Sequence, residues 1–333
     1  MIVVFTGGTG GTKLVQGLQE VVMPGDLTVV VNTGDDIDWW GLHISPDIDS
    51  VLYGLSGLLS KDRGWGVDGD SFRCLDRMKQ LGQPGWFSLG DLDLATHLTR
   101  TARLRAGRSL SETTAELAEK FGIRARVLPM SDQRVSTMLD TSKGTLTFQE
   151  YFVRERHQVE VQAVRFQDAD EAHPAPGVIE SIKSADAILL APSNPVTSIG
   201  PILAVPGIRE ALRTTGATVA AVSPIVGGAA VSGPAAQLMQ MKGWPSTITG
   251  VAQAYHDFLD ILVADVTDEK AFSTQQSASS APGSGAGSSA LSTTHSPLAT
   301  FVYANTMMHT LDDKRNLAAF LLEACEIRQS AKA

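Results

Sequence analysis

The chain of 333 residues carries 27 Lys and Arg against 36 Asp and Glu, which gives a formal net charge of −9. This acidic balance excludes the class of proteins that bind duplex nucleic acid on a basic face, because phosphate binding needs positive charge. Hydrophobic residues (43%) occur in strand-sized runs, and the two cysteines match no disulfide or zinc pattern, so we expect one cytoplasmic α/β domain over 1–333 without a membrane span.

Apolar runs alternate with helical patterns along most of the chain, which is typical of a Rossmann-like, mostly parallel sheet with helices on both faces. Strands are expected at residues 2–5, 27–31, 187–190, 218–222 and 261–266, and helices at 12–22, 179–184, 208–213 and beyond residues 234 and 311. The run Leu27–Val31 is continuous rather than alternating, as in a strand that is covered on both faces. In this prediction, strands from both ends of the chain share one sheet.

Two segments interrupt the alternation. Residues 50–120 carry helical periodicity, with helices expected near 72–81, 92–104 and 110–120, and we interpret this block as an inserted, mainly helical subdomain. Further strands are expected at 126–128, 135–139, 145–152 and 159–166. Residues 273–298 are dominated by Ser, Ala, Gly and Thr, which bury too little apolar surface to offset their ordering entropy. We predict a flexible surface loop there, whose deletion leaves activity intact.

The first candidate site is the glycine-rich run Thr6-Gly7-Gly8-Thr9-Gly10-Gly11-Thr12-Lys13, between the first strand and the first helix. Amides at a helix N-terminus attract a phosphate, and glycine lets the phosphate come close. The run is not a Walker loop, since Thr12 stands where the Gly before Lys belongs, and Lys13 breaks the dinucleotide fingerprint. The sequence predicts nucleotide binding, and the alternative is a tight turn without a ligand. The candidate residues are Thr6, Gly8, Thr9, Gly10, Gly11 and Lys13.

Four carboxylates form the second candidate site. Asp35 and Asp36 follow the second strand, at the edge of a parallel sheet where ligands bind. Asp47 and Asp49 stand just before a helix, in Ser45-Pro46-Asp47-Ile48-Asp49-Ser50. This concentration of negative charge suits Mg²⁺ or a proton transfer, so we predict all four acids as Mg²⁺ ligands. The alternatives are an Asp-rich turn for the first pair and a helix cap for one acid of the second.

Two more loops follow buried-type strands. They contain Ser193 and Asn194 in Ala191-Pro192-Ser193-Asn194-Pro195, and Ser223 in Ser223-Pro224-Ile225-Val226-Gly227. Their hydroxyl and amide groups can bind a base, a ribose or phosphates, and proline lowers the entropy cost of binding. Each is also an acceptable strand-to-helix loop, and the repetition at several strand ends is what indicates a ligand. The lone histidines, such as His97 and His256, show no metal spacing, so we expect structural roles for them.

Eight motifs then occur together in an order that resembles one family. They are Gly7-Gly8-Thr9-Gly10, Val-Val-Asn-Thr-Gly-Asp-Asp at 30–36, Ser-Pro-Asp-Ile-Asp at 45–49, Gly-Asp-Leu-Asp-Leu-Ala-Thr-His at 90–97, Leu-Pro-Met-Ser-Asp at 128–132, Ala-Pro-Ser-Asn-Pro at 191–195, Ser-Pro-Ile-Val-Gly at 223–227 and Val-Ser-Gly-Pro-Ala at 231–235. The chain resembles the 2-phospho-L-lactate transferases of coenzyme F-420 biosynthesis over almost its full length except 273–298.

The resemblance implies a Mg²⁺-dependent enzyme. A guanosine diphosphate ester, carrying lactate or enolpyruvate, donates its phosphoester group to the terminal ribityl hydroxyl of the deazaflavin Fo. The products are F-420-0 or its dehydro form, and GMP. The resemblance further implies a homodimer.

The resemblance also assigns roles to the candidate residues. It places the donor phosphates on Gly8–Gly11 and guanosine against Ser193, Asn194 and Ser223, with Asn32 as a further binding residue. Asp36, Asp47 and Asp49 become the catalytic candidates, with Asp49 as the Fo contact and the general base left open.

Two residues depart from the family pattern on the acceptor side. Ser88 stands where relatives often carry Lys or Arg near Fo, and Leu92 interrupts a common Gly-Asp-Arg-Asp. Two other classes remain as alternatives. One is a nucleotide-sugar-binding regulatory protein of the same superfold, which has no catalytic activity. The other is an NAD-dependent oxidoreductase, against which the incomplete glycine fingerprint argues.

Overall fold

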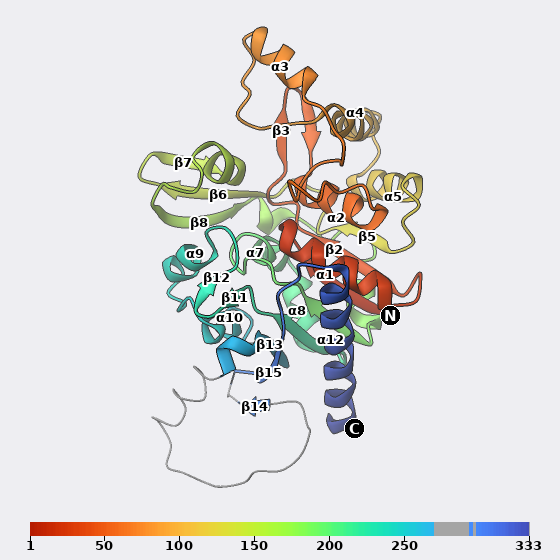
Figure 1. Ribbon diagram of the computed structural model, residues 1–333, viewed down its shortest axis with the longest axis vertical. Coiled ribbons are helices and arrows are strands. Elements are labelled where there is room, and N and C mark those ends of the chain that lie inside the picture. Colours follow the sequence, from red (N-terminus) through yellow and green to blue (C-terminus); the bar gives the residue numbers. More distant parts are fainter. Residues whose placement is uncertain (270–292, 296–297, 333) are drawn as a thin grey trace.

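A computed structural model of the chain describes residues 1–269, 293–295 and 298–332. Its centre is an eight-stranded sheet with the strand order β14-β15-β13-β10-β9-β1-β2-β5 (Figure 1). The strands are β1 (Ile2–Thr6), β2 (Leu27–Val31), β5 (Arg126–Pro129), β9 (Ala187–Leu190), β10 (Thr218–Val222), β13 (Ile261–Asp265), β14 (Thr293–His295) and β15 (Thr300–Ala304). Seven of them run parallel and β14 pairs antiparallel with β15, which confirms the mostly parallel sheet.

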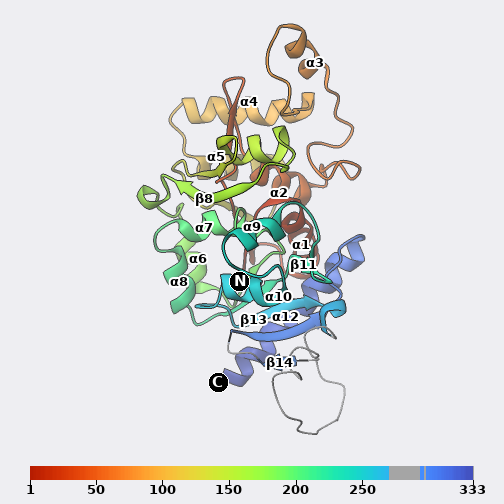
Figure 2. The ribbon, with the colours of Figure 1, turned by 90° about the vertical axis from the view of Figure 1, so that its left-hand side faces the viewer.

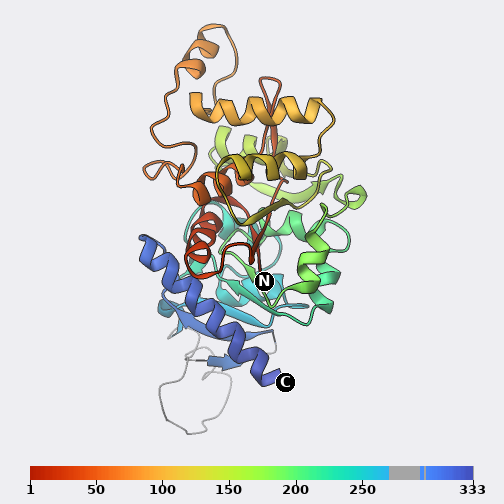
Figure 3. The same cartoon turned by 90° about the vertical axis from the view of Figure 1, so that its right-hand side faces the viewer.

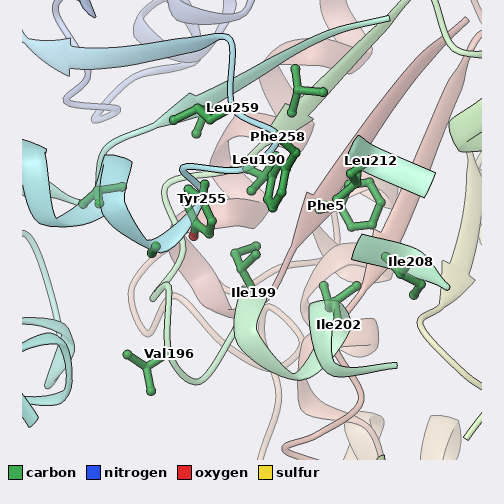
Figure 4. Packing of buried hydrophobic residues seen from close by; sticks show 14 of the residues in the cluster. Phe5, Leu190, Val196, Ile199, Ile202, Ile208, Leu212, Tyr255, Phe258 and Leu259 are labelled. Atoms are coloured by element: carbon green, nitrogen blue, oxygen red, sulfur yellow. The ribbon is translucent and has the colours of Figure 1, made fainter. Parts of the chain in front are cut away.

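Helices cover both faces of this sheet, because alternate residues of the central strands enter different cores. Val3 and Phe5 of β1 belong to one core and Val4 to the other. Phe5 packs with α7 (Ile199–Ala204), α8 (Ile208–Thr214) and the segment around Phe258 (Figure 4). The opposite core joins α1 (Gly8–Val21) to α12 (Leu311–Lys332), and the two helices lie side by side in Figure 3. Helices on both faces are therefore confirmed.

The chain between β2 and β5 is mainly helical and extends away from the sheet. It begins with the hairpin β3 (Ile37–Trp39) and β4 (Leu42–Ile44), which the sequence did not predict. The helices that follow are α2 (Pro46–Ser56), α3 (Arg73–Gln80), α4 (Asp91–Arg105) and α5 (Leu110–Lys120). A small third core, which includes Trp39 and Phe87, fills the space between the hairpin and α4. Figures 1 and 2 place α3 and α4 at the end of the molecule farthest from β13 and β15.

A second, antiparallel sheet follows β5. Its strands are β6 (Ser136–Thr141), β7 (Gly144–Thr147) and β8 (Val161–Gln167), in the order β7-β6-β8. The prediction of a strand over 145–152 is wrong beyond Thr147. There the Glu150 carboxylate accepts hydrogen bonds from the backbone N–H and the hydroxyl of Thr147, which turns the chain into the π-helix η1 (Glu150–Arg154).

The first helix begins at Gly8, four residues before the predicted start. Gly7 is extended and precedes it, and Gly8 has a positive φ of 70° that glycine adopts without strain. The glycine-rich run is therefore the first turn of α1 rather than a separate loop.

The remaining elements connect the ones above. They are η2 (Ala169–Glu171), α6 (Val178–Ser184), β11 (Ile225–Val226), β12 (Ala229–Ala230), α9 (Ala235–Met241) and α10 (Ile248–Ala254). The flexible loop predicted over 273–298 lies outside the described residues except for β14 and Leu298. Among the described helices, none is long and apolar enough to cross a membrane.

Candidate active site

A cavity of about 690 Å³ opens at the carboxyl edge of the central sheet. Segments that follow five of its strands contribute to the wall: Gly7–Gly10 after β1, Asp35 after β2, Pro192–Asn194 after β9, Ser223 after β10 and Thr306–His309 after β15. Residues from α2, α4 and η1 complete it. A cavity where parallel strands end is the usual place for a ligand in an open α/β sheet.

The N-terminus of α1 forms the polar floor of the cavity. The first N–H groups of a helix have no partner within it and carry the positive end of the helix dipole. Two nearby groups are already fixed: the Ser193 hydroxyl donates to the Gly7 carbonyl at 2.7 Å, and the Gly8 N–H donates to Asp47 Oδ1 at 2.7 Å. Thr9, Gly10 and Lys13 line the cavity beyond them. This end is therefore built to receive an anionic group.

Glycine is required behind this floor by close packing. A Cβ on Gly11 would lie 1.8 Å from Thr6 Oγ1 and 2.7 Å from Ser193 Oγ, and a Cβ on Gly7 would lie 2.8 Å from Asp47 Oδ2. The glycines thus let α1 approach the strand ends of β1 and β9.

The structure brings most of the predicted site residues to one cavity and leaves four behind its wall. Those that line it are Gly8, Thr9, Gly10, Lys13, Asp35, Asp47, Asp49, Ser88, Ser193, Asn194 and Ser223. Those that do not are Thr6, Gly11, Asn32 and Asp36. Thr6 and Gly11 pack against each other beneath the helix N-terminus, and the Asn32 amide donates to Asp47 Oδ2 at 2.9 Å.

Asp35 and Asp47 form a buried pair of carboxylates beside the glycine turn. Burial raises the pKa of Asp47 to about 6, against hydrogen bonds from Asn32 and Gly8 that lower it. Burial, and then the charge of Asp47, raise the pKa of Asp35 well above its usual range. Asp35 Oδ1 is buried and has no hydrogen-bond partner within the described residues. Neither carboxylate forms an ion pair within the described residues, so without a bound cation both pKa values shift toward the protonated form.

Asp36 has a different environment on the far side of this pair. Its Oδ2 accepts hydrogen bonds from Ser45 Oγ at 2.7 Å and lies 3.0 Å from His43 Nε2. Burial raises its pKa, and the contacts with His43 and Ser45 oppose that shift. Because Asp36 does not line the cavity, it has no direct access to a bound substrate.

Asp49 is held by a cation. It lies on α2, and the buried guanidinium of Arg100 from α4 contacts both of its oxygens, with Nη1 3.0 Å from Oδ2. Three more polar side chains surround this pair: Tyr53 from α2, and Asp93 and His97 from α4. Asp49, Tyr53, Asp93 and His97 all line the cavity.

Arg100, Tyr53 and Asp93 are not among the residues predicted to be functional, and His97 was expected to be structural. A signal was available, since Asp93, His97 and Arg100 recur at helical spacing and share one face of α4. Charged residues on one helix face usually indicate a solvated surface, and here that face is buried.

The other end of the cavity is aromatic. Phe148 and Phe152 stack with their ring centroids 5.4 Å apart and their planes 9° apart, and both line the cavity together with Trp65 and Phe87. Phe152 keeps 38% of its surface exposed. Exposed parallel rings suit a flat aromatic ligand.

A Mg²⁺ ion fits the pair of Asp35 and Asp47 better than it fits the predicted set of four acids. Within the described ranges, no group of three or more His, Cys, Asp or Glu side chains is arranged to hold a metal on its own. Mg²⁺ is usually bound through one or two carboxylates plus substrate phosphates, and Asp35 and Asp47 supply two. Asp35 Oδ1, which has no hydrogen-bond partner within the described residues, is the ligand atom that would bind such an ion. Asp36 and Asp49 are instead committed to His43, Ser45 and Arg100.

Comparisons with known proteins find related enzymes and a related structure. The sequence model of the family "2-phospho-L-lactate transferase CofD" matches residues 2–289. The chain is 45% identical over 267 residues to the 2-phospho-L-lactate transferase of Methanosarcina mazei, which covers 80% of this chain and 88% of the relative. It is also 45% identical over 273 residues to the phosphoenolpyruvate transferase of Streptomyces griseus, which covers 80% and 86%. A solved structure of a UPF0052 family member from Bacillus halodurans matches with a TM-score of 0.54 and 20% identity, over 83% of this chain and 84% of that one, and shows a shared fold.

Proposed function

The chain belongs to the CofD family of 2-phospho-L-lactate transferases, and from that premise we propose that it acts on a guanosine diphosphate ester and the deazaflavin Fo. That the enzyme transfers a 2-phospho-L-lactate or phosphoenolpyruvate group follows from its family and its relatives. The observation that carries the finer assignment is a single cavity with an anion-binding helix turn and a carboxylate pair at one end and stacked aromatic rings at the other.

The donor suits the polar end. Its diphosphate would lie at the N-terminus of α1, where the helix dipole and the Lys13 side chain favour negative charge. The guanosine would lie beside Ser193, Asn194 and Ser223 on the neighbouring strand ends, where the Ser193 and Ser223 hydroxyls already donate to the Gly7 and Ile225 carbonyls. Lactate and enolpyruvate are both retained as the three-carbon acid of the donor.

The acceptor suits the aromatic end. The flat ring of Fo would lie against the Phe148 and Phe152 rings, which line this end of the cavity. Ser88 lines the same cavity and carries no charge, so stacking would contribute more than charge to binding of the ring. The ribityl chain would then point its terminal hydroxyl toward the acids.

The chemistry is the attack of that hydroxyl on the phosphorus that carries the three-carbon acid. The bond from this phosphorus to the bridging oxygen breaks, and GMP leaves with that oxygen. The hydroxyl must give up its proton as it attacks, and a carboxylate at the cavity wall is suited to accept it. Asp49, whose carboxylate is held in place by Arg100, is suited to orient the hydroxyl.

Mg²⁺, when bound, supplies positive charge to the diphosphate as the bridging oxygen takes up electrons. The residues that would hold it are Asp35 and Asp47. We also propose that the enzyme is a cytoplasmic homodimer. Light scattering on the purified 35.3 kDa chain tests the dimer, and a monomer mass would reject it.

Mass spectrometry of reaction mixtures tests the proposed function. The purified protein is incubated with Fo, MgCl₂ and each guanosine diphosphate ester in turn, and F-420-0 or dehydro-F-420-0 is expected together with GMP. D47N and D49N should lose most of this turnover. D140N serves as the matched control, because Asp140 pairs with Arg165 on the surface of the second sheet. If no donor is consumed while a nucleotide still binds, the proposed substrates are wrong.

A further inference from the structure

The contact between Asp49 and Arg100 joins the cavity to the helical block. Asp49 lies on α2 at the cavity wall, whereas Arg100 lies on α4 behind it and is fully buried. The guanidinium meets the carboxylate with two nitrogens and two oxygens, which fixes the orientation of the carboxylate as well as its charge. Burial lowers the pKa of Arg100, and the charge and hydrogen bonds of Asp49, together with the charges of Asp36 and Tyr53, raise that pKa above its usual value.

The neighbours of this pair hold Arg100 and Asp49 from the remaining sides. His97 Nδ1 lies 3.4 Å from Arg100 Nη1 and 3.5 Å from Asp49 Oδ2. His97 Nε2 lies 3.2 Å from Asp93 Oδ1, and that same oxygen accepts a hydrogen bond of 2.7 Å from the Tyr53 hydroxyl. The cluster of Asp49, Tyr53, Asp93, His97 and Arg100 therefore places its carboxylates toward the cavity and its one permanent cation away from it.

Stability alone gives little reason to keep such a pair. Buried ion pairs cost so much desolvation that apolar residues of similar volume often replace them without loss of stability. The same helix offers a contrast, since Arg103 makes a similar two-pronged contact with Glu116 at the surface. The pair of Arg100 and Asp49 differs because one partner faces the cavity.

We propose that Arg100 is a positioning residue, which fixes the Asp49 carboxylate toward the acceptor end of the cavity. This inference rests on the proposed function, because it assumes that Asp49 orients the attacking hydroxyl. Arg100 touches no substrate and acts only through Asp49. A displacement of about 1 Å at a reacting group can reduce a rate by about 100-fold, so the loss of the guanidinium is expected to lower kcat far more than substrate binding.

The test is a double-mutant cycle with five proteins besides the wild type: R100M, R100K, D49N, the double variant D49N/R100M, and R103M as the matched control. R100M should lower kcat by about 100-fold or more, with the KM for the donor and the affinity for GMP changed by less than about 3-fold. R100K keeps the positive charge but loses the two-nitrogen contact, so its kcat should lie between those of R100M and the wild type. R103M should keep the wild-type rate.

The double variant separates a positioning role from a structural one. R100M leaves Asp49 charged and buried without its cation, so its Tm should fall, and D49N/R100M should recover most of that Tm. Activity should not return with the stability, and the loss in D49N/R100M should not exceed the larger single loss.

Four results would overturn the inference: a wild-type rate in R100M, multiplied losses in the double variant, activity that recovers together with Tm, or a double variant as unstable as R100M. If the wild type transfers nothing to Fo, the proposed function fails instead. The Tm cycle then still decides whether the pair is dispensable for folding, as the inference requires.

Discussion

Replacing Asp47 by Asn should destabilise the folded protein at pH 4 and stabilise it at pH 8. Asp47 is buried, and its carboxylate accepts hydrogen bonds from the Gly8 N–H and the Asn32 amide. Its pKa is raised from 3.8 to about 6 on folding, mainly by burial. A carboxyl with a raised pKa stabilises the folded state while it is protonated, and this contribution is lost as the pH rises through about 6.

The magnitude follows from the gap between the two pKa values. At about 1.4 kcal/mol per pH unit, ionised Asp47 costs the folded state about 3 kcal/mol above pH 7 and less than about 1 kcal/mol at pH 4. D47N has no ionisable group at this position and avoids this cost. Its amide NH₂, however, faces one of the two donors that Asp47 accepts from, and this lost hydrogen bond costs about 1–2 kcal/mol at every pH. D47N should therefore be less stable than the wild type at pH 4 and more stable at pH 8, with a swing of about 2 kcal/mol.

Urea unfolding of both proteins at pH values from 4 to 8, without added metal, measures this swing. D140N is the control, because the hydrogen bond from Arg165 lowers the pKa of surface Asp140 to about 2, below the range tested. The difference in free energy of unfolding between D140N and the wild type should therefore not change with pH. If the difference in free energy of unfolding between D47N and the wild type does not change with pH, or if D47N is less stable at every pH, the reasoning is refuted. Burial would then not raise the pKa of this carboxylate as described.

Three further predictions concern other parts of the site. Mg²⁺ at millimolar concentration should raise the Tm of the wild type at pH 8 but not that of D47N, and equal shifts would argue against a site at this carboxylate. G11A should lose about 1–3 kcal/mol of stability and bind GDP more weakly by calorimetry, because the added Cβ would meet Thr6 Oγ1, whereas G216A, with open space at its Cβ, should match the wild type. F152A should raise the KM for Fo about 3- to 10-fold and leave the KM for the donor unchanged, and an effect on the donor instead would place the two substrates the other way round.

The central sheet could be predicted from the sequence because its strands are buried on both faces. Val29 and Val31 enter one core and Val30 the other, so the run is apolar without interruption and its type is unambiguous. The glycine turn and the acids at strand ends followed from the same logic, since parallel strands bring their carboxyl ends to one edge.

Other parts could not be predicted because their causes are not local. The hairpin of β3 and β4 is too short to show a period, and it is held by packing of Trp39 against Phe87. The segment Thr306–His309 reaches the cavity only because β15 lies beside β13 in the sheet. Arg100 looks like part of a solvated helix until its face of α4 is seen against Asp49.

The packing of α1 against α12 has a consequence for the order in which the protein can assemble during synthesis. A Cβ on Gly17 would lie 2.1 Å from the Lys314 carbonyl oxygen, so the backbones of the two helices are in contact. The two helices lie near opposite ends of the sequence. The helix that begins with the glycine-rich turn therefore lacks its α12 neighbour until residues beyond 311 have left the ribosome. Nascent chains of this enzyme should therefore depend on chaperones until translation is nearly finished, and the cavity, which Thr306–His309 help to line, is complete only after that point.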